Sequence, residues 1–96
     1  MNKDDISVLV CDDSALMRNL ISRIIENTQG LSVCARAMNG QMALDKIDEA
    51  KPDVIVLDVE MPVMSGIDFL RKKKKRHIDI PVIVLSSIAT EGASVT

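Results

Sequence analysis

Three short apolar runs in this chain each end in polar side chains able to bind a metal ion or a phosphate group. Apolar runs of about four to eight residues between turn signals are typical of buried β-strands. The runs and the polar residues after them are 8–11 with Asp12 and Asp13, 54–57 with Asp58, and 82–85 with Ser86 and Ser87. A fourth segment, 31–37, alternates apolar and polar residues, which predicts a half-exposed strand.

The segments between these strands carry apolar residues at helical spacing. Ser14 stands at an N-cap position ahead of the first helix, and Gly30 follows that helix as a stop signal. A turn signal at residues 39–40 precedes the second helix, which is expected to end before Pro52.

The third helix is predicted to begin near Gly66 and to bury Ile67, Phe69 and Leu70. It runs into five consecutive cations at 72–76. The simplest interpretation is the solvated end of a helix, where positive side chains suit the helix dipole. A basic docking patch is the alternative.

Strands and helices alternate along the chain, which predicts an α/β fold with a parallel sheet and right-handed crossovers. Continuous apolar runs suit strands covered on both faces, and the alternating segment 31–37 suits an edge strand. We therefore predict the strand order 2-1-3-4. Ligands of such sheets bind at the carboxyl ends of the strands, so the acidic residues after the first and third strands should meet in one crevice.

The composition of the chain excludes some classes of function but does not identify one. The 96 residues are 47% apolar and 27% charged, which suits one small globular domain. A net charge of −2 and the lack of Trp and Tyr give no footprint for a general DNA or membrane binder. Cys11 and Cys34 fall inside strands and are interpreted as buried small hydrophobes of a reducing compartment. With no signal peptide and no spanning apolar run, a cytoplasmic location is expected.

Asp12, Asp13 and Asp58 would repel one another if they shared one crevice. A cation among them would relieve this repulsion, and oxygen ligands without His or Cys favour a hard ion such as Mg²⁺. One carboxylate could then attack phosphorus and form an aspartyl phosphate, while a hydroxyl across the crevice donates a hydrogen bond to the phosphoryl oxygens. The sequence therefore predicts magnesium-dependent phosphoryl chemistry.

These motifs resemble those of the response-regulator receiver domain over essentially the whole chain. The matching segments are 8–14, 52–66 and 81–87. The resemblance implies a flavodoxin-like three-layer fold. It also implies that Asp58 is the phosphoacceptor and a ligand of Mg²⁺, and that a histidine kinase is the phosphodonor.

Further roles follow from the same resemblance. Asp13 would ligate Mg²⁺ directly, Asp12 would help through a water molecule, and the backbone carbonyl of Glu60 would be another ligand. Ser86 would be the switch hydroxyl that moves toward the phosphoryl group. Ser65 departs from the family, which usually has Asp or Asn before this glycine, but the change stays within turn chemistry.

Within receivers, the residues at 13–18, 58–62 and 85–87 are similar to the regulatory domain of the chemotaxis protein-glutamate methylesterase. In that family the receiver precedes an esterase domain of the same chain and restrains it until phosphorylated. The 96 residues carry no esterase site, so this hydrolase domain is expected outside them. Residues 1–96 are interpreted as one receiver domain that is incomplete at its C-terminus, because the family continues through a fifth strand carrying a Lys.

Without that fifth strand, the outer edge of the strand at 81–85 would stay unpaired. An unpaired strand edge offers backbone donors and acceptors to another chain. We therefore expect the 96-residue chain either to self-associate through this edge or to be part of a longer ordered protein.

Other functions fit parts of the pattern. A haloacid-dehalogenase-like phosphatase also has a nucleophilic Asp after a buried strand and an acid two residues on, as Asp58 and Glu60 stand here. That family places its metal-binding Asp pair late in the chain, whereas Asp12 and Asp13 come first. A phosphate-independent interaction domain, or the receiver of a different response regulator, is a further alternative. No glycine-rich nucleotide-binding motif occurs.

Overall fold

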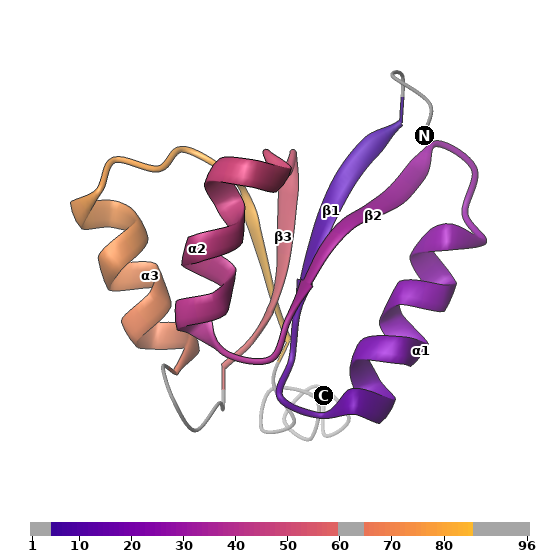
Figure 1. The fold of residues 1–96 in the computed structure, drawn as a ribbon, viewed down its shortest axis with the longest axis horizontal. Helices are drawn as coiled ribbons and strands as arrows, with labels where there is room; N and C mark the ends of the chain where they lie inside the picture. The colour runs from indigo at the N-terminus through magenta and orange to yellow at the C-terminus, as the bar shows by residue number, and fades with distance from the viewer. Residues whose placement is uncertain (1–4, 60–64, 86–96) are drawn as a thin grey trace, which may run out of the picture.

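The computed structural model describes residues 5–59 and 65–85. Within these residues, four parallel strands form one sheet in the order β2-β1-β3-β4, with helices in the connections (Figure 1). The elements are β1 (Ile6–Cys11), α1 (Ala15–Glu26), β2 (Leu31–Ala37), α2 (Gly40–Ala50), β3 (Val54–Asp58), α3 (Gly66–Lys75) and β4 (Val82–Leu85). The predicted α/β class and strand order are confirmed. None of the described helices is long and apolar enough to cross a bilayer.

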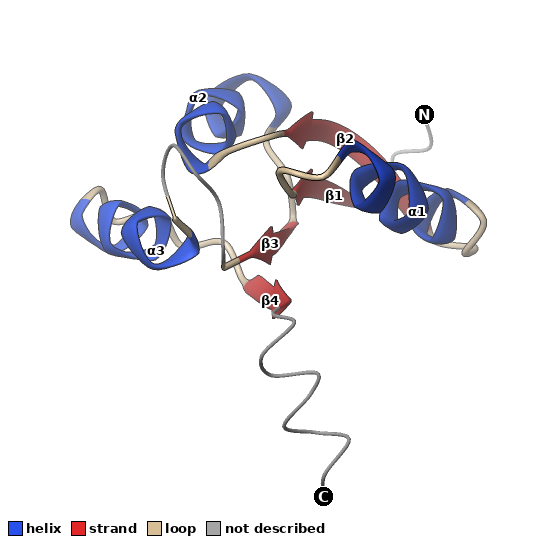
Figure 2. Ribbon diagram, turned by 90° about the horizontal axis from the view of Figure 1, so that it is seen from below, coloured by secondary structure: helices blue, strands red, loops and turns tan. Residues whose placement is uncertain are grey.

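The sheet lies between two helical layers, with α2 and α3 on one face and α1 on the other (Figure 2). Side chains alternate between the two faces of a strand, so β1 and β3 supply apolar residues to both layers. The larger buried cluster, under α2 and α3, consists of Leu9, Cys11, Ala37, Ala43, Leu44, Ile47, Ile55, Leu57 and Phe69. The smaller one, under α1, consists of Val8, Val10, Ile25 and Val56.

Each helix begins at a side chain that accepts a hydrogen bond from the amide three residues further on. Ser14, Asn39 and Ser65 accept these bonds at 3.2, 2.8 and 3.1 Å. The predicted turn at residues 39–40 is therefore the start of α2. A serine at position 65 can replace the Asp or Asn that the family usually has there, because all three side chains serve as N-caps.

The prediction that Ile67 is buried was wrong, since its exposed fraction is 53%. Phe69 is fully buried, and Leu70 packs half-buried against the same cluster. Helical residues two apart point in nearly opposite directions, so Ile67 and Phe69 cannot both face the sheet. In α1, neighbouring residues differ by about 100° around the helix axis, so Ile25 is buried while Ile24 is 65% exposed.

The strand β2 is the predicted edge strand and contains one irregularity in its pairing with β1. Val8 pairs with Val33, but the next residue, Leu9, pairs with Ala35. The register thus skips Cys34, in the manner of a β-bulge. Cys34 is half-buried rather than buried.

Two serines of the α1 region should respond to replacement by alanine with opposite signs. Ser14→Ala removes the N-cap bond and should lower the free energy of unfolding by about 1 kcal/mol.

Ser22 is 1% exposed, and its hydroxyl has no hydrogen-bond partner among the described residues. Ser22→Ala should therefore raise the unfolding free energy by about 1 kcal/mol, since a buried unsatisfied hydroxyl is removed. Urea denaturation measures both, and a loss of stability in Ser22→Ala would contradict the assignment.

Candidate functional site

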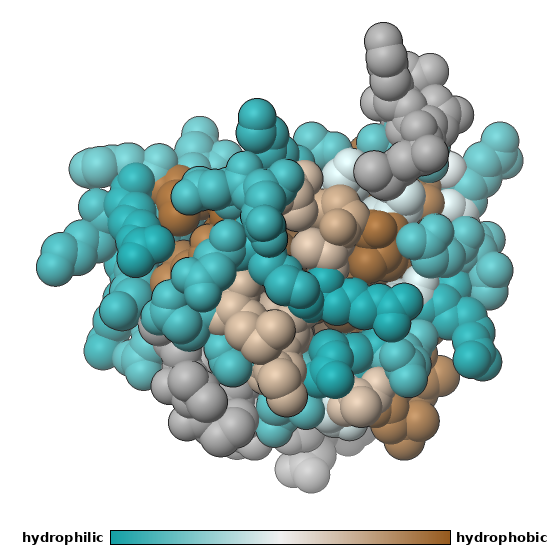
Figure 3. Space-filling view, in the orientation of Figure 1, coloured by the Kyte–Doolittle hydropathy of each residue, from teal (hydrophilic) through white to brown (hydrophobic). Residues whose placement is uncertain are grey.

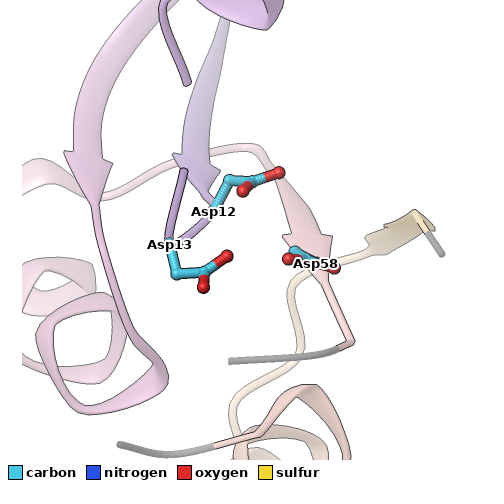
Figure 4. Close-up of side chains that lie close together, drawn as sticks. All are labelled: Asp12, Asp13 and Asp58. Atoms are coloured by element: carbon cyan, nitrogen blue, oxygen red, sulfur yellow. The ribbon is translucent and has the colours of Figure 1, made fainter. Parts of the chain in front are cut away.

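The parallel pairing of β1 with β3 brings the predicted acidic residues together. Cys11 pairs with Leu57, so Asp12 and Asp58 follow paired positions on adjacent strands. One carboxylate oxygen from each of Asp12, Asp13 and Asp58 lies within 4.8 Å of the others. Figure 4 shows the three side chains at the carboxyl ends of the two strands. We call these three residues the acidic cluster, and their predicted convergence is confirmed.

Asp12 is the most firmly held member of the cluster. Its exposed fraction is 6%, and its Oδ1 accepts a hydrogen bond of 2.9 Å from the amide of Ser14. The Asp12 amide donates to the carbonyl of Ala37 (3.1 Å), which extends the pairing of β1 with β2. The guanidinium of Arg18 donates to the Asp12 carbonyl oxygen at 2.7 Å. Asp12 thus has both its backbone and its carboxylate fixed.

Asp58 lies at the end of β3 and is half-buried, whereas Asp13 is exposed. The next amide, that of Val59, donates to the carbonyl of Leu85 at 3.2 Å. The Val59 carbonyl accepts 2.8 Å from the amide of Gly66, which joins the start of α3 to the end of β3. Asp58 is therefore positioned by β1 on one side and by β4 and α3 on the other.

Gly66 is needed because no side chain fits between α3 and β3 at this point. A Cβ atom on Gly66 would lie 2.7 Å from Cα of Val59 and 2.8 Å from the carbonyl oxygen of Asp58. Such distances are shorter than van der Waals contact, so the backbone beside the acidic cluster would have to move.

Cys11 lies beneath the acidic cluster but does not add a thiolate to it. Burial raises the pKa of its thiol to about 12, and the negative charges of Asp12 and Asp58 act in the same direction. Its Sγ donates a hydrogen bond to the carbonyl of Asn39 at 3.4 Å. Because the thiol stays protonated near neutral pH, the metal-ligating side chains that the described residues bring to the site are carboxylates.

The cluster fits a hard cation. Three carboxylates this close repel one another, and a cation bound among them would lower the repulsion. Oxygen donors in place of thiolate or imidazole favour Mg²⁺ or a similar ion. Glu60 and Ser86, the other two predicted site residues, lie outside the described residues, so their roles stay predictions.

Two contributors to the site were missed in the sequence. Arg18 lies in the motif region, but nothing in the spacing shows that its guanidinium reaches the Asp12 carbonyl. Gly66 was predicted only as a helix start, and its close approach to Asp58 depends on how α3 crosses the end of β3. A glycine directly after a good N-cap residue was the available signal.

The fold and the acidic cluster define a class of α/β domains with an acidic site at the carboxyl ends of a parallel sheet. Residues 8–95 match the family described as the response regulator receiver domain. The chain belongs to this family.

Within the receiver family, the chain is similar to proteins of bacterial chemotaxis. The protein-glutamate methylesterase/protein-glutamine glutaminase of Treponema denticola is 61% identical over 93 residues, which are 97% of this chain and 25% of that protein. The response regulator domain of Thermotoga maritima CheB has a TM-score of 0.81 and 42% identity, over 86% of this chain and 61% of that one. A structure of the CheA3 P1 domain in complex with CheY6 from R. sphaeroides matches with a TM-score of 0.76 and 41% identity, over 93% of this chain and 69% of that one. The chain spans about a quarter of the length of the curated relatives it matches.

Gly66→Ala tests how closely α3 approaches the acidic cluster. The added methyl group should lower the free energy of unfolding by about 1–3 kcal/mol, because backbone atoms rather than a flexible side chain must give way. It should also shift the backbone amide resonances of Asp58 and Val59 in two-dimensional NMR spectra. Wild-type stability together with unchanged resonances would show that the approach is looser than the structure indicates.

Proposed function

We propose that this chain is the phosphoacceptor receiver domain of a chemotaxis regulator and that Asp58 accepts the phosphoryl group. The observation that carries the proposal is the acidic cluster, in which three carboxylates from adjacent strands come within 4.8 Å of one another. The family assignment supports a receiver rather than a phosphatase fragment. Residues 1–96 would all belong to this domain.

The three carboxylates are suited to different roles. Asp12 is buried and its Oδ1 is occupied by the Ser14 amide, so its carboxylate suits a fixed role in holding a cation. Asp58 is half-buried at the end of β3, a central strand that holds its backbone in place. A nucleophile held on a rigid strand does not need to be oriented again at each reaction.

In the proposed reaction, a carboxylate oxygen of Asp58 attacks the phosphorus atom of a phosphohistidine on a histidine kinase. A P–O bond forms to Asp58 as the P–N bond breaks, and the electron pair of that bond returns to the imidazole. With acetyl phosphate as donor, the P–O bond to the acetyl group breaks and acetate leaves. Asp58 carries the phosphoryl group as an acyl phosphate in both cases.

The residues that would hold Mg²⁺ are Asp12, Asp13 and Asp58, with the Glu60 carbonyl as the ligand implied by the family. When bound, the ion would neutralise charge on the phosphoryl oxygens and on the carboxylates. Arg18 would act as a positioning residue, because it fixes the carbonyl of Asp12 and hence the loop that carries Asp13.

The output of the proposed regulator is a protein-glutamate methylesterase. Support comes from relatives of that name, which share up to 61% identity with this chain and are about four times as long. The whole protein would then hydrolyse methyl esters of glutamate side chains, or deamidate glutamines, on a protein substrate. Self-association through the β4 edge and a cytoplasmic location both stay predictions.

The phosphoacceptor is tested by intact-mass spectrometry. Wild-type chain incubated with acetyl phosphate and Mg²⁺ should gain the mass of one phosphoryl group, because Asp58 is the only member of the cluster proposed to attack phosphorus. Asp58→Asn should gain none. Asp48→Asn, which removes one exposed carboxylate from α2, is the matched control and should be labelled like the wild type. Equal labelling of Asp58→Asn and wild type would remove Asp58 from this role.

The metal is tested by thermal melting at constant ionic strength. A ligand bound only by the folded state at a hundredfold excess over its Kd stabilises by about 2.7 kcal/mol, so added Mg²⁺ should raise the melting temperature. Asp13→Ala should abolish the rise, and Asp45→Ala, an exposed acid of α2, should keep it. Asp13→Asn should stabilise the metal-free protein, because one repelling charge is lost. A Mg²⁺ response of Asp13→Ala equal to that of the wild type would place the ion elsewhere.

A further inference from the structure

The C-terminal part of α3 carries a run of cations that the proposed phosphoryl chemistry does not use. Residues 71–76 are all Lys or Arg, and all are exposed except Lys73, which is half-buried. The chain has a net charge of −2, so the residues outside this run together carry −8. Positive charge is therefore gathered on one helix of an otherwise acidic chain.

The helix dipole explains part of this arrangement but not all of it. A cation in the last turn of a helix is stabilised by the dipole. Like charges four residues apart destabilise a helix, however, and the run contains two such pairs, Arg71 with Lys75 and Lys72 with Arg76. Among the described residues, the run has one ion pair, between Arg71 Nη1 and Asp68 Oδ1 at 3.9 Å, with both side chains well exposed. An exposed pair at this distance contributes little, so ion pairs among residues 5–59 and 65–85 balance little of this positive charge.

Four of the cations lie on one side of the helix and together line a single hollow. These are Arg71, Lys72, Lys75 and Arg76. Because they come in two pairs four residues apart, the hollow presents positive charge at a spacing of about one helical turn. Figure 3 shows hydrophilic side chains projecting from the side of the molecule where α3 lies.

We propose that this hollow, the α3 basic surface, docks an acidic helical segment of the protein substrate that carries glutamates about one turn apart. The proposal rests on the proposed function as a methylesterase regulator. Hydrolysis of a glutamate methyl ester, or of a glutamine amide, leaves a carboxylate on the substrate protein. The product segment therefore carries at least one glutamate side chain, and two glutamates four residues apart on a helix would match the spacing of the two cation pairs.

The size and composition of the surface favour an acidic peptide over other polyanions. Surfaces that bind single-stranded nucleic acid commonly add aromatic side chains for stacking, but this chain has no Trp or Tyr, and its single Phe69 is buried. A lipid surface or a long duplex would also meet the acidic remainder of the domain, which would repel it. A single helix contacting α3 avoids that repulsion. Docking of the substrate on the receiver would raise its concentration near the output domain.

Fluorescence anisotropy tests the proposal with the 96-residue chain and a labelled alanine-based helical peptide. The probe carries glutamates at positions i and i+4, and its control carries glutamines there. We expect the glutamate peptide to bind about tenfold more tightly than the glutamine peptide, and to weaken as salt is added. Lys72→Gln/Arg76→Gln should lose about tenfold in affinity, since it removes one pair of the hollow. The matched control, Arg23→Gln/Lys46→Gln, makes the same change of charge on other elements and should bind like the wild type.

Several results would overturn the proposal. One is equal loss of affinity in the two double variants, which would show a general charge effect. Another is binding of the glutamine peptide as tightly as the glutamate peptide. Tighter binding of a DNA duplex or of phosphatidylglycerol vesicles, lost in Lys72→Gln/Arg76→Gln, would assign the surface to a different partner.

Phosphoryl labelling keeps this proposal separate from the phosphoacceptor assignment. Lys72→Gln/Arg76→Gln should still be labelled by acetyl phosphate, because the α3 basic surface does not take part in that reaction. Normal labelling with no selective peptide binding would overturn the docking surface alone. Selective peptide binding without labelling of the wild type would support the docking surface and overturn only the role of Asp58.

Discussion

The rest of the site depends on the parallel pairing of β1 with β3. Cys11 stands beside Leu57, and the residues that follow on the two strands are carboxylates. Alone, Asp12, Asp13 and Asp58 would move apart to reduce their repulsion. They stay within 4.8 Å because both strands are anchored by fully buried side chains such as Leu9 and Ile55. Apolar burial in the sheet thus holds an electrostatically unfavourable cluster in place.

The start of α3 serves the same site from the other side. Ser65 caps the helix with a bond that Asp or Asn could also make, so this position has chemical freedom. Its neighbour Gly66 has none, because the backbone of Asp58 and Val59 fills the space where a Cβ would lie. Two adjacent residues therefore differ in tolerance because one acts through a hydrogen bond and the other through close packing.

The features that were predictable from the sequence are those encoded locally. Apolar runs and helical spacing gave the strand order, and the general rule for parallel sheets placed Asp12, Asp13 and Asp58 at one edge.

The features that could not be predicted depend on contacts between elements or on the exact rotation of a helix. Ile67 is apolar and follows the first residue of α3, yet it faces outward because Gly66 and Phe69 occupy the inner side. Asn39 seemed to mark a turn because asparagine favours turns and N-caps alike. The bond from Arg18 to the Asp12 carbonyl could not be predicted, since the residues between them, 13–17, include the start of α1 and its direction decides where Arg18 reaches.

The irregular pairing at Cys34 makes the two edges of the sheet differ in how readily another strand can be added. A regular ladder lets a newly added strand form bonds along its whole length, whereas a bulge breaks that ladder and bends the strand. On β2 the break falls after three paired residues, so an extra strand laid against this side would find only short regular stretches. The pairing of β3 with β4 is unbroken from Val82 to Leu85. Growth of the sheet, whether by its own chain or by another, is therefore favoured beyond β4 and resisted beyond β2.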